Sequence, residues 1–198
     1  MSKQHPVIAV TGSSGAGTTT VKRALEHIFY RDGFNAAIIE GDSFHRYDRA
    51  EMKSAMAKAA EEHRNLSHFG AEANRFDMLE ELFKSYGSTG SGKKRYYIHS
   101  EEEAAELNAR LGTNLDPGQF TPWEEIPEGT DLLFYEGLHG LVVTEEHNVA
   151  EHVDLGVGVV PIVNLEWIQK IHRDNLERGY SAEAIVDTIM RRMPDYIT

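Results

Sequence analysis

The chain has 198 residues, with 32 acidic residues against 20 lysines and arginines, so its formal net charge is −12 with histidine neutral. This charge disfavours a general nucleic-acid or anionic-membrane binder, and the absence of cysteine excludes disulfides, thiolate metal sites and thiol switches. No apolar stretch is long enough for a signal peptide or a membrane span, so we expect a cytoplasmic protein with a single domain over residues 1–198.

The first expected elements are a short apolar strand, a glycine-rich turn and a helix, over residues 7–10, 11–20 and 21–30. This order is typical of the phosphate-binding unit of nucleotide-binding α/β proteins. Glycine lets backbone N–H groups approach an anion, and the helix N-terminus adds partial positive charge. A glycine-rich turn with no nucleotide role is the alternative. The predicted nucleotide contacts are Gly12, Ser13, Ser14, Gly15, Ala16, Gly17, Thr18, Thr19 and Thr20.

One position of this loop departs from the usual pattern. The spacing G-x-x-x-x-G-x-T is met, but Thr18 stands where that pattern has lysine. We therefore expect the missing positive charge to come from Lys22, one helical turn further on, or from Lys170. Thr19 is placed to offer its hydroxyl to Mg²⁺.

A second buried strand is expected at Ala36–Glu40, followed by Gly41 and Asp42. Short apolar strands joined by a helix imply a right-handed parallel βαβ unit, in which ligands bind at the carboxyl ends of the strands. Asp42 therefore reaches the same edge as the phosphate-binding loop. A carboxylate there could accept the proton of a hydroxyl that attacks the γ-phosphate, and a simple cap or turn aspartate is the alternative.

Basic side chains follow Asp42 at the start of an expected helix over residues 50–63. Arg49 and Lys53 are four residues apart, so both can lie on one helix face. Together with His45 they would suit a sugar-phosphate substrate. The alternative is a solvated basic face.

Residues 64–130 do not repeat the strand–helix pattern, and we expect a substrate-side insertion in this stretch. Its expected elements are a helix, a polar loop, a strand and an acidic helix, over residues 72–86, 87–92, 94–99 and 100–111. Histidines in this stretch lack regular metal spacing, so a zinc site is not expected.

The next buried strand, residues 132–135, ends at Glu136. An acid in this place is typical of the second carboxylate of a P-loop enzyme, which holds Mg²⁺ directly or through water opposite Thr19. A further strand-rich segment covers residues 153–163, where Pro161 favours a sheet edge or terminus. The strands together predict an α/β fold with a P-loop kinase-like, mostly parallel sheet flanked by helices.

The last expected elements are helices over residues 165–178 and 182–193, the second capped by Ser181. The buried side of the first helix is expected to contain Leu165, Ile168 and either Ile171 or His172. Lys170 and Arg173 share a face and resemble a closing lid that neutralises charge on a transferred phosphoryl group. A charged surface helix is the alternative.

Six segments carry a resemblance to a known family: VTGSSGAGTTT, IEGDSFHRYDR, HFGAEAN, RYYIH, LFYEGLHG and VNLEWIQKIHRD…RGY. The chain resembles the phosphoribulokinase family, in its bacterial form. Threonine in place of the loop lysine is a feature of that family and argues against the related uridine kinases, which keep the lysine. The resemblance implies ATP- and Mg²⁺-dependent phosphorylation of ribulose 5-phosphate at its 1-hydroxyl, giving ribulose 1,5-bisphosphate in the reductive pentose phosphate (Calvin) cycle.

The resemblance also implies roles for single residues. Asp42 would be the general base, Glu136 with Thr19 would hold the metal, and Lys170 and Arg173 would stabilise the transition state. The residues that would hold or line the sugar-phosphate site are His45, Arg49, Lys53, Arg178, Tyr97 and His99. Family members of this type are oligomeric and activated by NADH, and Arg31 matches a position linked to that effector.

The family continues beyond the residue aligned with Thr198, so we expect this chain to lack the C-terminal part that completes the sheet. Two other functions remain open at this point. One is a uridine-kinase-like or other small-metabolite kinase that uses the same loop. The other is a non-catalytic nucleotide-binding module.

Overall fold

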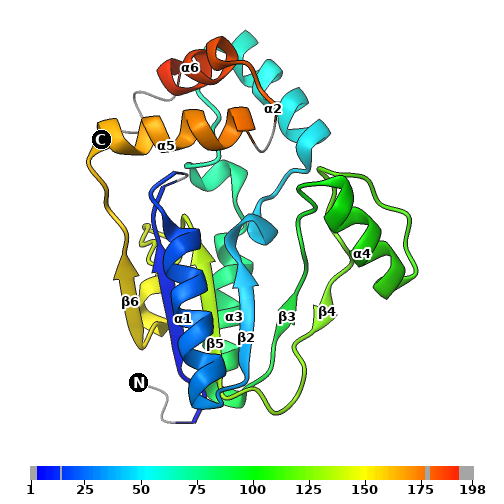
Figure 1. The fold of residues 1–198 in the computed structure, drawn as a ribbon, viewed down its shortest axis with the longest axis vertical. Coiled ribbons are helices and arrows are strands. Elements are labelled where there is room, and N and C mark those ends of the chain that lie inside the picture. Colours follow the sequence, from blue (N-terminus) through cyan, green and yellow to red (C-terminus); the bar gives the residue numbers. More distant parts are fainter. Residues whose placement is uncertain (1–3, 14, 177–178, 192–198) are drawn as a thin grey trace.

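The computed structural model describes residues 4–13, 15–176 and 179–191 (Figure 1). Its centre is a four-stranded parallel sheet with the strand order β2-β5-β1-β6. In that order, the strands span Ala36–Glu40, Leu132–Gly137, Val7–Thr11 and Leu155–Gly158. The predicted α/β fold with a parallel sheet is confirmed.

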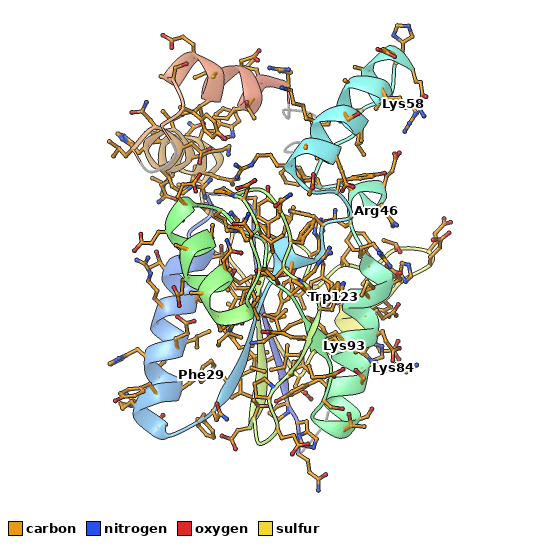
Figure 2. All side chains as sticks on the ribbon, turned by 90° about the vertical axis from the view of Figure 1, so that its right-hand side faces the viewer. Phe29, Arg46, Lys58, Lys84, Lys93 and Trp123 are labelled. Carbon is orange, nitrogen blue, oxygen red and sulfur yellow. The ribbon has the colours of Figure 1, made fainter. Side chains whose placement is uncertain are left out.

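Helices cover both faces of this sheet. On one face α1 (Thr18–Asp32) packs with Phe29 edge-on against Phe134, and the ring centroids are 5.4 Å apart. On the other face α3 (Phe76–Thr89) packs with Phe83 edge-on against Tyr135, also at 5.4 Å. Successive strand residues point to opposite faces, so neighbouring residues of β5 fill two different cores. Figure 2 shows Phe29 on the α1 side and Trp123 on the α3 side.

The helix predicted at residues 72–86 begins and ends later than expected, at Phe76 and Thr89. A short 3₁₀ turn, η2 (Ala71–Ala73), precedes it. The loop predicted at residues 87–92 is therefore wrong in its first half. The hydroxyls of Ser88 and Thr89 donate 2.8 Å hydrogen bonds to the carbonyls four residues earlier, and the helix ends only at Gly90, whose φ of 72° suits glycine.

Between α3 and β5 the chain leaves the sheet. β3 (Lys93–Lys94) pairs antiparallel with β4 (Glu124–Glu125), and α4 (Glu101–Leu111) lies between them. The strand predicted at residues 94–99 is wrong beyond Lys94. The backbone of residues 96–98 hydrogen-bonds only irregularly to residues 118–121, so no continuous ladder forms.

The segment after β2 forms a 3₁₀ turn, η1 (Gly41–Phe44), and then α2 (Arg49–Glu61). A capping box starts α2: the Asp48 side chain accepts from the Glu51 amide, and the Glu51 side chain accepts from the Asp48 amide. This cap fixes the direction in which α2 leaves the sheet edge.

The last helices, α5 (Val163–Leu176) and α6 (Ala182–Arg191), lie across the carboxyl end of the sheet (Figure 1). The predicted burial of α5 is wrong at Leu165 and Ile168, which are 46% and 52% exposed. Of the two alternatives at the next position, Ile171 is half-buried and His172 is exposed. The face turned toward the protein is charged instead: its residues Glu166, Lys170 and Asp174 are at most 5% exposed.

A third short 3₁₀ turn, η3 (Val149–His152), connects the segment after β5 to β6. Ser181 caps α6 as predicted, through a 3.2 Å hydrogen bond from the Ala184 amide, and residues 192–193 of the predicted helix lie outside the described part of the chain. Among the residues described, no helix is long and apolar enough to span a bilayer.

Candidate active site

Three segments meet at the carboxyl ends of the parallel strands. The glycine-rich loop follows β1, η1 with Asp42 follows β2, and Glu136 lies near the end of β5. In the sheet register Glu136 is opposite both Val10 and Glu40. The structure thus brings together the loop and the two carboxylates that were singled out in the sequence.

The glycine-rich loop has the backbone conformations that only glycine adopts easily. Gly15 and Gly17 have φ values of 105° and 97°, and Gly17 starts α1 with open space where a side chain would be. Gly12 is needed for packing, since a Cβ there would lie 2.7 Å from the Val159 carbonyl oxygen. Ser14 lies outside the described residues. The loop therefore presents backbone N–H groups and the N-terminus of α1 to the sheet edge.

Thr18, at the position of the usual lysine, is buried and turned toward Glu136. Burial raises the pKa of the Glu136 carboxyl, helped by the nearby charges of Glu40 and Asp42, whereas a hydrogen bond from Thr18 and the charge of Lys22 act in the opposite direction. On balance the pKa of Glu136 is raised. Thr19 and Thr20 are exposed on the first turn of α1.

Lys22 lies one turn into α1 and forms a 2.7 Å ion pair with Glu40. Burial disfavours its ammonium, but the charges of Glu40, Glu26 and Glu136 outweigh that effect and raise the pKa of Lys22. A permanent positive charge therefore stands beside the carboxylates although Thr18 has none.

Asp42 is held between two histidine rings. Its Oδ1 is 3.2 Å from His45 Nε2 and its Oδ2 is 3.6 Å from His99 Nε2, while half of the side chain remains exposed. Removal from water opposes ionisation, but the hydrogen bond from His45 and the charges of His45, His99 and His68 prevail and hold the pKa of Asp42 well below its usual value. Asp42 is therefore a carboxylate over the whole neutral range.

Two residues that were not predicted from sequence, Asn74 and His139, lie near the Asp42–His45 pair. The buried Asn74 amide oxygen is 2.8 Å from His45 Nδ1. His139 Nε2 is 3.0 Å from the Phe69 carbonyl oxygen, and burial lowers the pKa of this imidazole to about 4, so it is neutral. Both lie more than 25 residues from Asp42 in sequence, and no local pattern connects them to it.

Arg95, just after β3, was also missed. Its guanidinium donates to the carbonyls of Ser43 and His45 at 2.7 and 2.8 Å. The same group stacks on Phe120, 3.7 Å from the ring centroid, and burial lowers its pKa to about 10, which leaves it charged. Arg95 thus connects η1, which contains Asp42, to the segment between β3 and β4 (residues 95–123), which we call the excursion.

A pair of glycines allows η1 to approach β5. A Cβ at Gly41 would lie 2.9 Å from Gly137 Cα and would also collide with the Tyr135 hydroxyl beneath it. That hydroxyl accepts a 3.3 Å hydrogen bond from the His139 amide. The close backbone contact brings the residues next to the glycines, Asp42 and Glu136, to the same place.

The charged face of α5 lies against the glycine-rich loop. Ser13 donates a 2.5 Å hydrogen bond to Glu166, and a Cβ at Gly15 would be 3.3 Å from Lys170 Cβ. Asp174 accepts from Lys170 at 2.8 Å and from Arg173 at 2.9 Å. Burial opposes the Asp174 carboxylate, but these two cations outweigh it and lower its pKa. Lys170 and Arg173, the two lid cations predicted from sequence, therefore both bind Asp174, a carboxylate that was not predicted.

The other predicted substrate residues are more dispersed. Arg49 is exposed at the start of α2, with its guanidinium 3.5 Å from the Pro117 carbonyl oxygen, and Lys53 is exposed one turn later. The Tyr97 ring lies 5.0 Å from the His99 ring, beside Asp42. Arg178 lies outside the described residues. Arg31 is at the opposite end of α1 from the loop, paired with Asp32.

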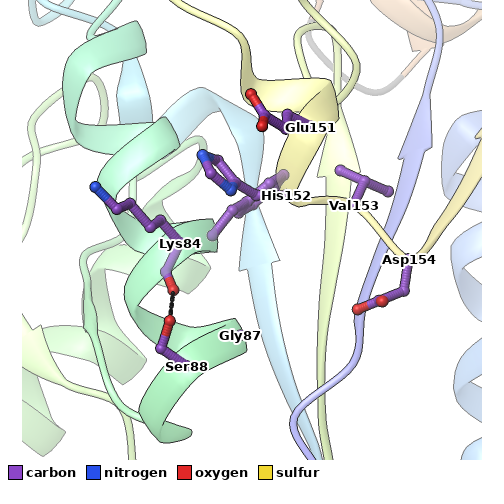
Figure 3. A pocket seen from close by; sticks show the side chains of 8 residues that line it. Lys84, Gly87, Ser88, Glu151, His152, Val153 and Asp154 are labelled. Atoms are coloured by element: carbon purple, nitrogen blue, oxygen red, sulfur yellow. Dashed lines mark hydrogen bonds between the residues drawn. The ribbon is translucent and has the colours of Figure 1, made fainter. Parts of the chain in front are cut away.

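A separate hollow of about 310 Å³ opens between α3 and η3 (Figure 3). Its lining includes Lys84, Ser88, His152 and Asp154. None of the predicted site residues contributes to it. The hollow is therefore distinct from the site at the sheet edge.

Residues 4–13, 15–176 and 179–191 contain no ready-made cluster of three or more acidic, histidine or cysteine ligands for a metal. Mg²⁺ needs fewer protein ligands, because it commonly binds through one or two carboxylates and the phosphates of its substrate. Burial is the main cause that raises the pKa of Glu136, and the charges of Glu40 and Asp42 add to it, so a bound cation would relieve the repulsion among these carboxylates. The Glu136 carboxylate is a ligand of the kind that Mg²⁺ prefers. The hydroxyl that lies beside this carboxylate is that of Thr18, whereas Thr19 is exposed one residue further on.

A family model described as Phosphoribulokinase / Uridine kinase family matches residues 7–198. The chain is 60% identical over 198 residues to the plasmid-encoded phosphoribulokinase of Cupriavidus necator, and 56% identical over 198 residues to the phosphoribulokinase of Nitrobacter vulgaris. In both comparisons the alignment covers 100% of this chain and 66% of the relative.

Solved structures show the same relationship. Phosphoribulokinase from Rhodobacter spheroides superposes with a TM-score of 0.81 at 47% identity, over 99% of this chain and 65% of that one. D-glycerate 3-kinase from Cryptococcus neoformans shares the fold, with a TM-score of 0.60 at 13% identity, over 98% of this chain and 78% of that one. The chain spans about two thirds of the length of the curated relatives that it matches.

Proposed function

We propose, since this chain belongs to the phosphoribulokinase / uridine kinase family, that it transfers the γ-phosphoryl group of ATP to the 1-hydroxyl of ribulose 5-phosphate. The observation that carries the proposal is the position of Asp42. It is an ionised, half-exposed carboxylate at the sheet edge, beside the glycine-rich loop and Glu136. A base in this place is what phosphoryl transfer to a sugar hydroxyl requires.

In the proposed step, the O–H bond of the acceptor breaks and its proton goes to the Asp42 carboxylate. The acceptor oxygen forms a new bond to the γ-phosphorus while the bond from that phosphorus to the β,γ-bridging oxygen breaks, and ADP leaves. The loop N–H groups and the N-terminus of α1 would hold the phosphates. Thr19 and Glu136 would bind Mg²⁺, which when bound offsets the phosphate charge.

The charges around the loop support the same step. Lys22 stands beside Glu136, and Lys170 and Arg173 lie on α5 over the loop. Both lid cations are held by Asp174 and could turn toward a phosphoryl group as α5 adjusts. They would replace the charge that Thr18 does not supply and stabilise the transition state.

The acceptor site would form between η1, α2 and the excursion. His45, His99 and Tyr97 surround Asp42, and Arg49 and Lys53 extend along α2. Arg178 would complete the set.

We also propose that the protein is a cytoplasmic homo-oligomer and that NADH acts on it near Arg31. The 60% identity to a protein named phosphoribulokinase supports placing this chain among the phosphoribulokinases of that type.

The natural full-length protein, assayed with ATP and Mg²⁺ against a panel of acceptors, tests the proposal. We expect phosphorylation of ribulose 5-phosphate and not of uridine. D42N should lower kcat at least ~10²-fold with little change in ATP binding. E145Q, at an exposed glutamate away from the site, should leave both unchanged. Uridine phosphorylation in place of ribulose 5-phosphate phosphorylation would overturn the assignment.

A further inference from the structure

Asn74 is a buried polar residue to which the proposed mechanism gives no role. It is 2% exposed and lies directly after η2, where its backbone forms an isolated bridge with His45. Its Nδ2 donates to the carbonyls of His68 and Gly70, at 2.8 and 2.7 Å. Because only the NH₂ end of an amide can serve two carbonyls, the end that faces His45 must be the oxygen.

The orientation of Asn74 decides where the protons of His45 are. An amide oxygen is only an acceptor, so His45 Nδ1, 2.8 Å away, must donate and therefore carries a proton. The other ring nitrogen, Nε2, lies 3.2 Å from Asp42 Oδ1. If Nε2 had no proton, its lone pair would face a carboxylate oxygen. With a proton it donates a charge-assisted hydrogen bond.

We propose that Asn74 is a positioning residue: it holds His45 with Nδ1–H toward the amide oxygen, so that the ring meets Asp42 as an imidazolium and fixes that carboxylate ionised and oriented for the acceptor hydroxyl. The use of this arrangement in catalysis rests on the proposed function. The protonation state of His45 does not.

The surroundings of His45 agree with this arrangement. The titratable groups near the Asp42–His45 pair are His68, His99, His139, Tyr135 and Glu136, and the charged Arg95 donates to the His45 carbonyl. The His68 ring lies 4.6 Å from the His45 ring, and its carbonyl is one of the two groups that fix Asn74. His139, whose burial keeps it neutral, adds no competing positive charge. The turn of residues 68–70 supplies the two carbonyls that orient the Asn74 amide. Through Asn74 and then His45, this turn therefore orients Asp42.

In the transfer step this arrangement requires only one proton to move, from the acceptor hydroxyl to Asp42. The acceptor O–H bond breaks and its proton goes to Asp42, which becomes neutral, while His45 keeps both of its ring protons. The imidazolium is therefore an orienting group and an electrostatic partner, not the final proton acceptor. Loss of Asn74 would free the His45 ring to rotate or to change its tautomer, and Asp42 would lose the nearer of its two histidine partners, with His99 remaining at 3.6 Å.

The first experiment observes His45 directly. In the full-length protein labelled with ¹⁵N-histidine, and assigned with H45Q, both ring nitrogens of His45 should be protonated near neutral pH. In N74A these signals should move toward those of a neutral or tautomerically mixed ring. N108A removes another loop-bracing asparagine, which bonds to Leu115 and Thr113 and not to a histidine, and should leave them unchanged. An unprotonated Nδ1 or Nε2 in the unmodified protein overturns the proposal.

The second experiment separates positioning from structural support. N74A should lower kcat about tenfold or more while KM for ATP changes little, and should have less than about a twofold effect when His45 is already alanine. An equal loss in both backgrounds would mean that Asn74 only braces the 68–70 turn, and the proposal would be wrong. If the ¹⁵N signals are as expected but ribulose 5-phosphate is not phosphorylated, the proposed function fails and the inference about His45 stands.

Discussion

The Ser13 hydroxyl donates a 2.5 Å hydrogen bond to Glu166, so a buried carboxylate of α5 lies against the loop that we propose binds phosphate. A second anion near that loop must overcome the charge of Glu166 or displace it. We therefore expect E166Q, which keeps the size and hydrogen-bonding capacity of the side chain, to strengthen ADP and ATP binding several-fold.

Calorimetric titration of the full-length protein with each nucleotide measures this effect. E183Q, at an exposed glutamate in the first turn of α6, is the matched control and should bind as the unmodified protein does. Weaker binding by E166Q would show instead that Glu166 orders the loop for the nucleotide.

Arg95 offers a second test, because it donates to the carbonyls of Ser43 and His45 on both sides of Phe44. A lysine keeps the charge but cannot reproduce the planar two-point contact or the stacking on Phe120. R95K should therefore lower kcat about tenfold, with a smaller change in KM for ATP, in a steady-state assay. K93M changes an exposed lysine of β3 and should retain full activity. If R95K only reduced the fraction of folded protein, and each folded molecule kept the normal kcat, this role would be contradicted.

The glycine pair at the sheet edge predicts a stability effect. In G41A the new methyl group would collide with the Tyr135 hydroxyl and with Gly137, both part of a rigid strand. Overpacking of this kind costs about 1–3 kcal/mol, which urea unfolding can measure. G158A introduces a methyl group into open space at the end of β6 and should change stability by less than about 0.5 kcal/mol. Equal stability of the two variants would refute the packing account.

His139 predicts how stability depends on pH. Burial lowers the pKa of this imidazole from 6.5 to about 4 in the folded protein. Between these two values the unfolded chain binds a proton that the folded chain does not, so His139 destabilises the fold progressively as pH falls from about 6.5 to about 4, by up to about 3 kcal/mol.

Urea unfolding at neutral pH and near pH 5 measures this slope. H139Q keeps a side-chain N–H donor for the Phe69 carbonyl but cannot titrate, so it should lose stability less steeply on acidification. H27Q, at an exposed histidine of α1, should behave as the unmodified protein does. An unchanged slope in H139Q would assign the acid sensitivity to other groups.

The features that were predictable from sequence are those encoded within a few neighbouring residues. The apolar strands, the Gly12–Thr19 spacing and the acidic residues Asp42 and Glu136 at strand ends all belong to this class, since a parallel sheet places strand ends together. The fold followed from them. Thr18 could be recognised as a departure, but its contact with Glu136 could not, because that contact joins the first turn of α1 to the end of β5, more than 100 residues later.

The misses have a common physical origin. Asn74, Arg95 and His139 reach Asp42 through tertiary contacts, and their neighbours in sequence give no sign of it. The burial of α5 was inverted because apolar periodicity normally marks the inner face. In α5 the inner face lies against the polar glycine-rich loop, and that face contains Glu166 and Lys170.

Arg95 connects the segment between β3 and β4 to the turn that contains Asp42, and this limits how that segment can be exchanged. Replacing residues 93–125 with the corresponding loop of a related kinase would change the proposed acceptor site and would also remove the contact that holds Asp42, the proposed base. New specificity would then arrive with poor turnover unless the transplanted loop also supplied a guanidinium to the carbonyls of Ser43 and His45.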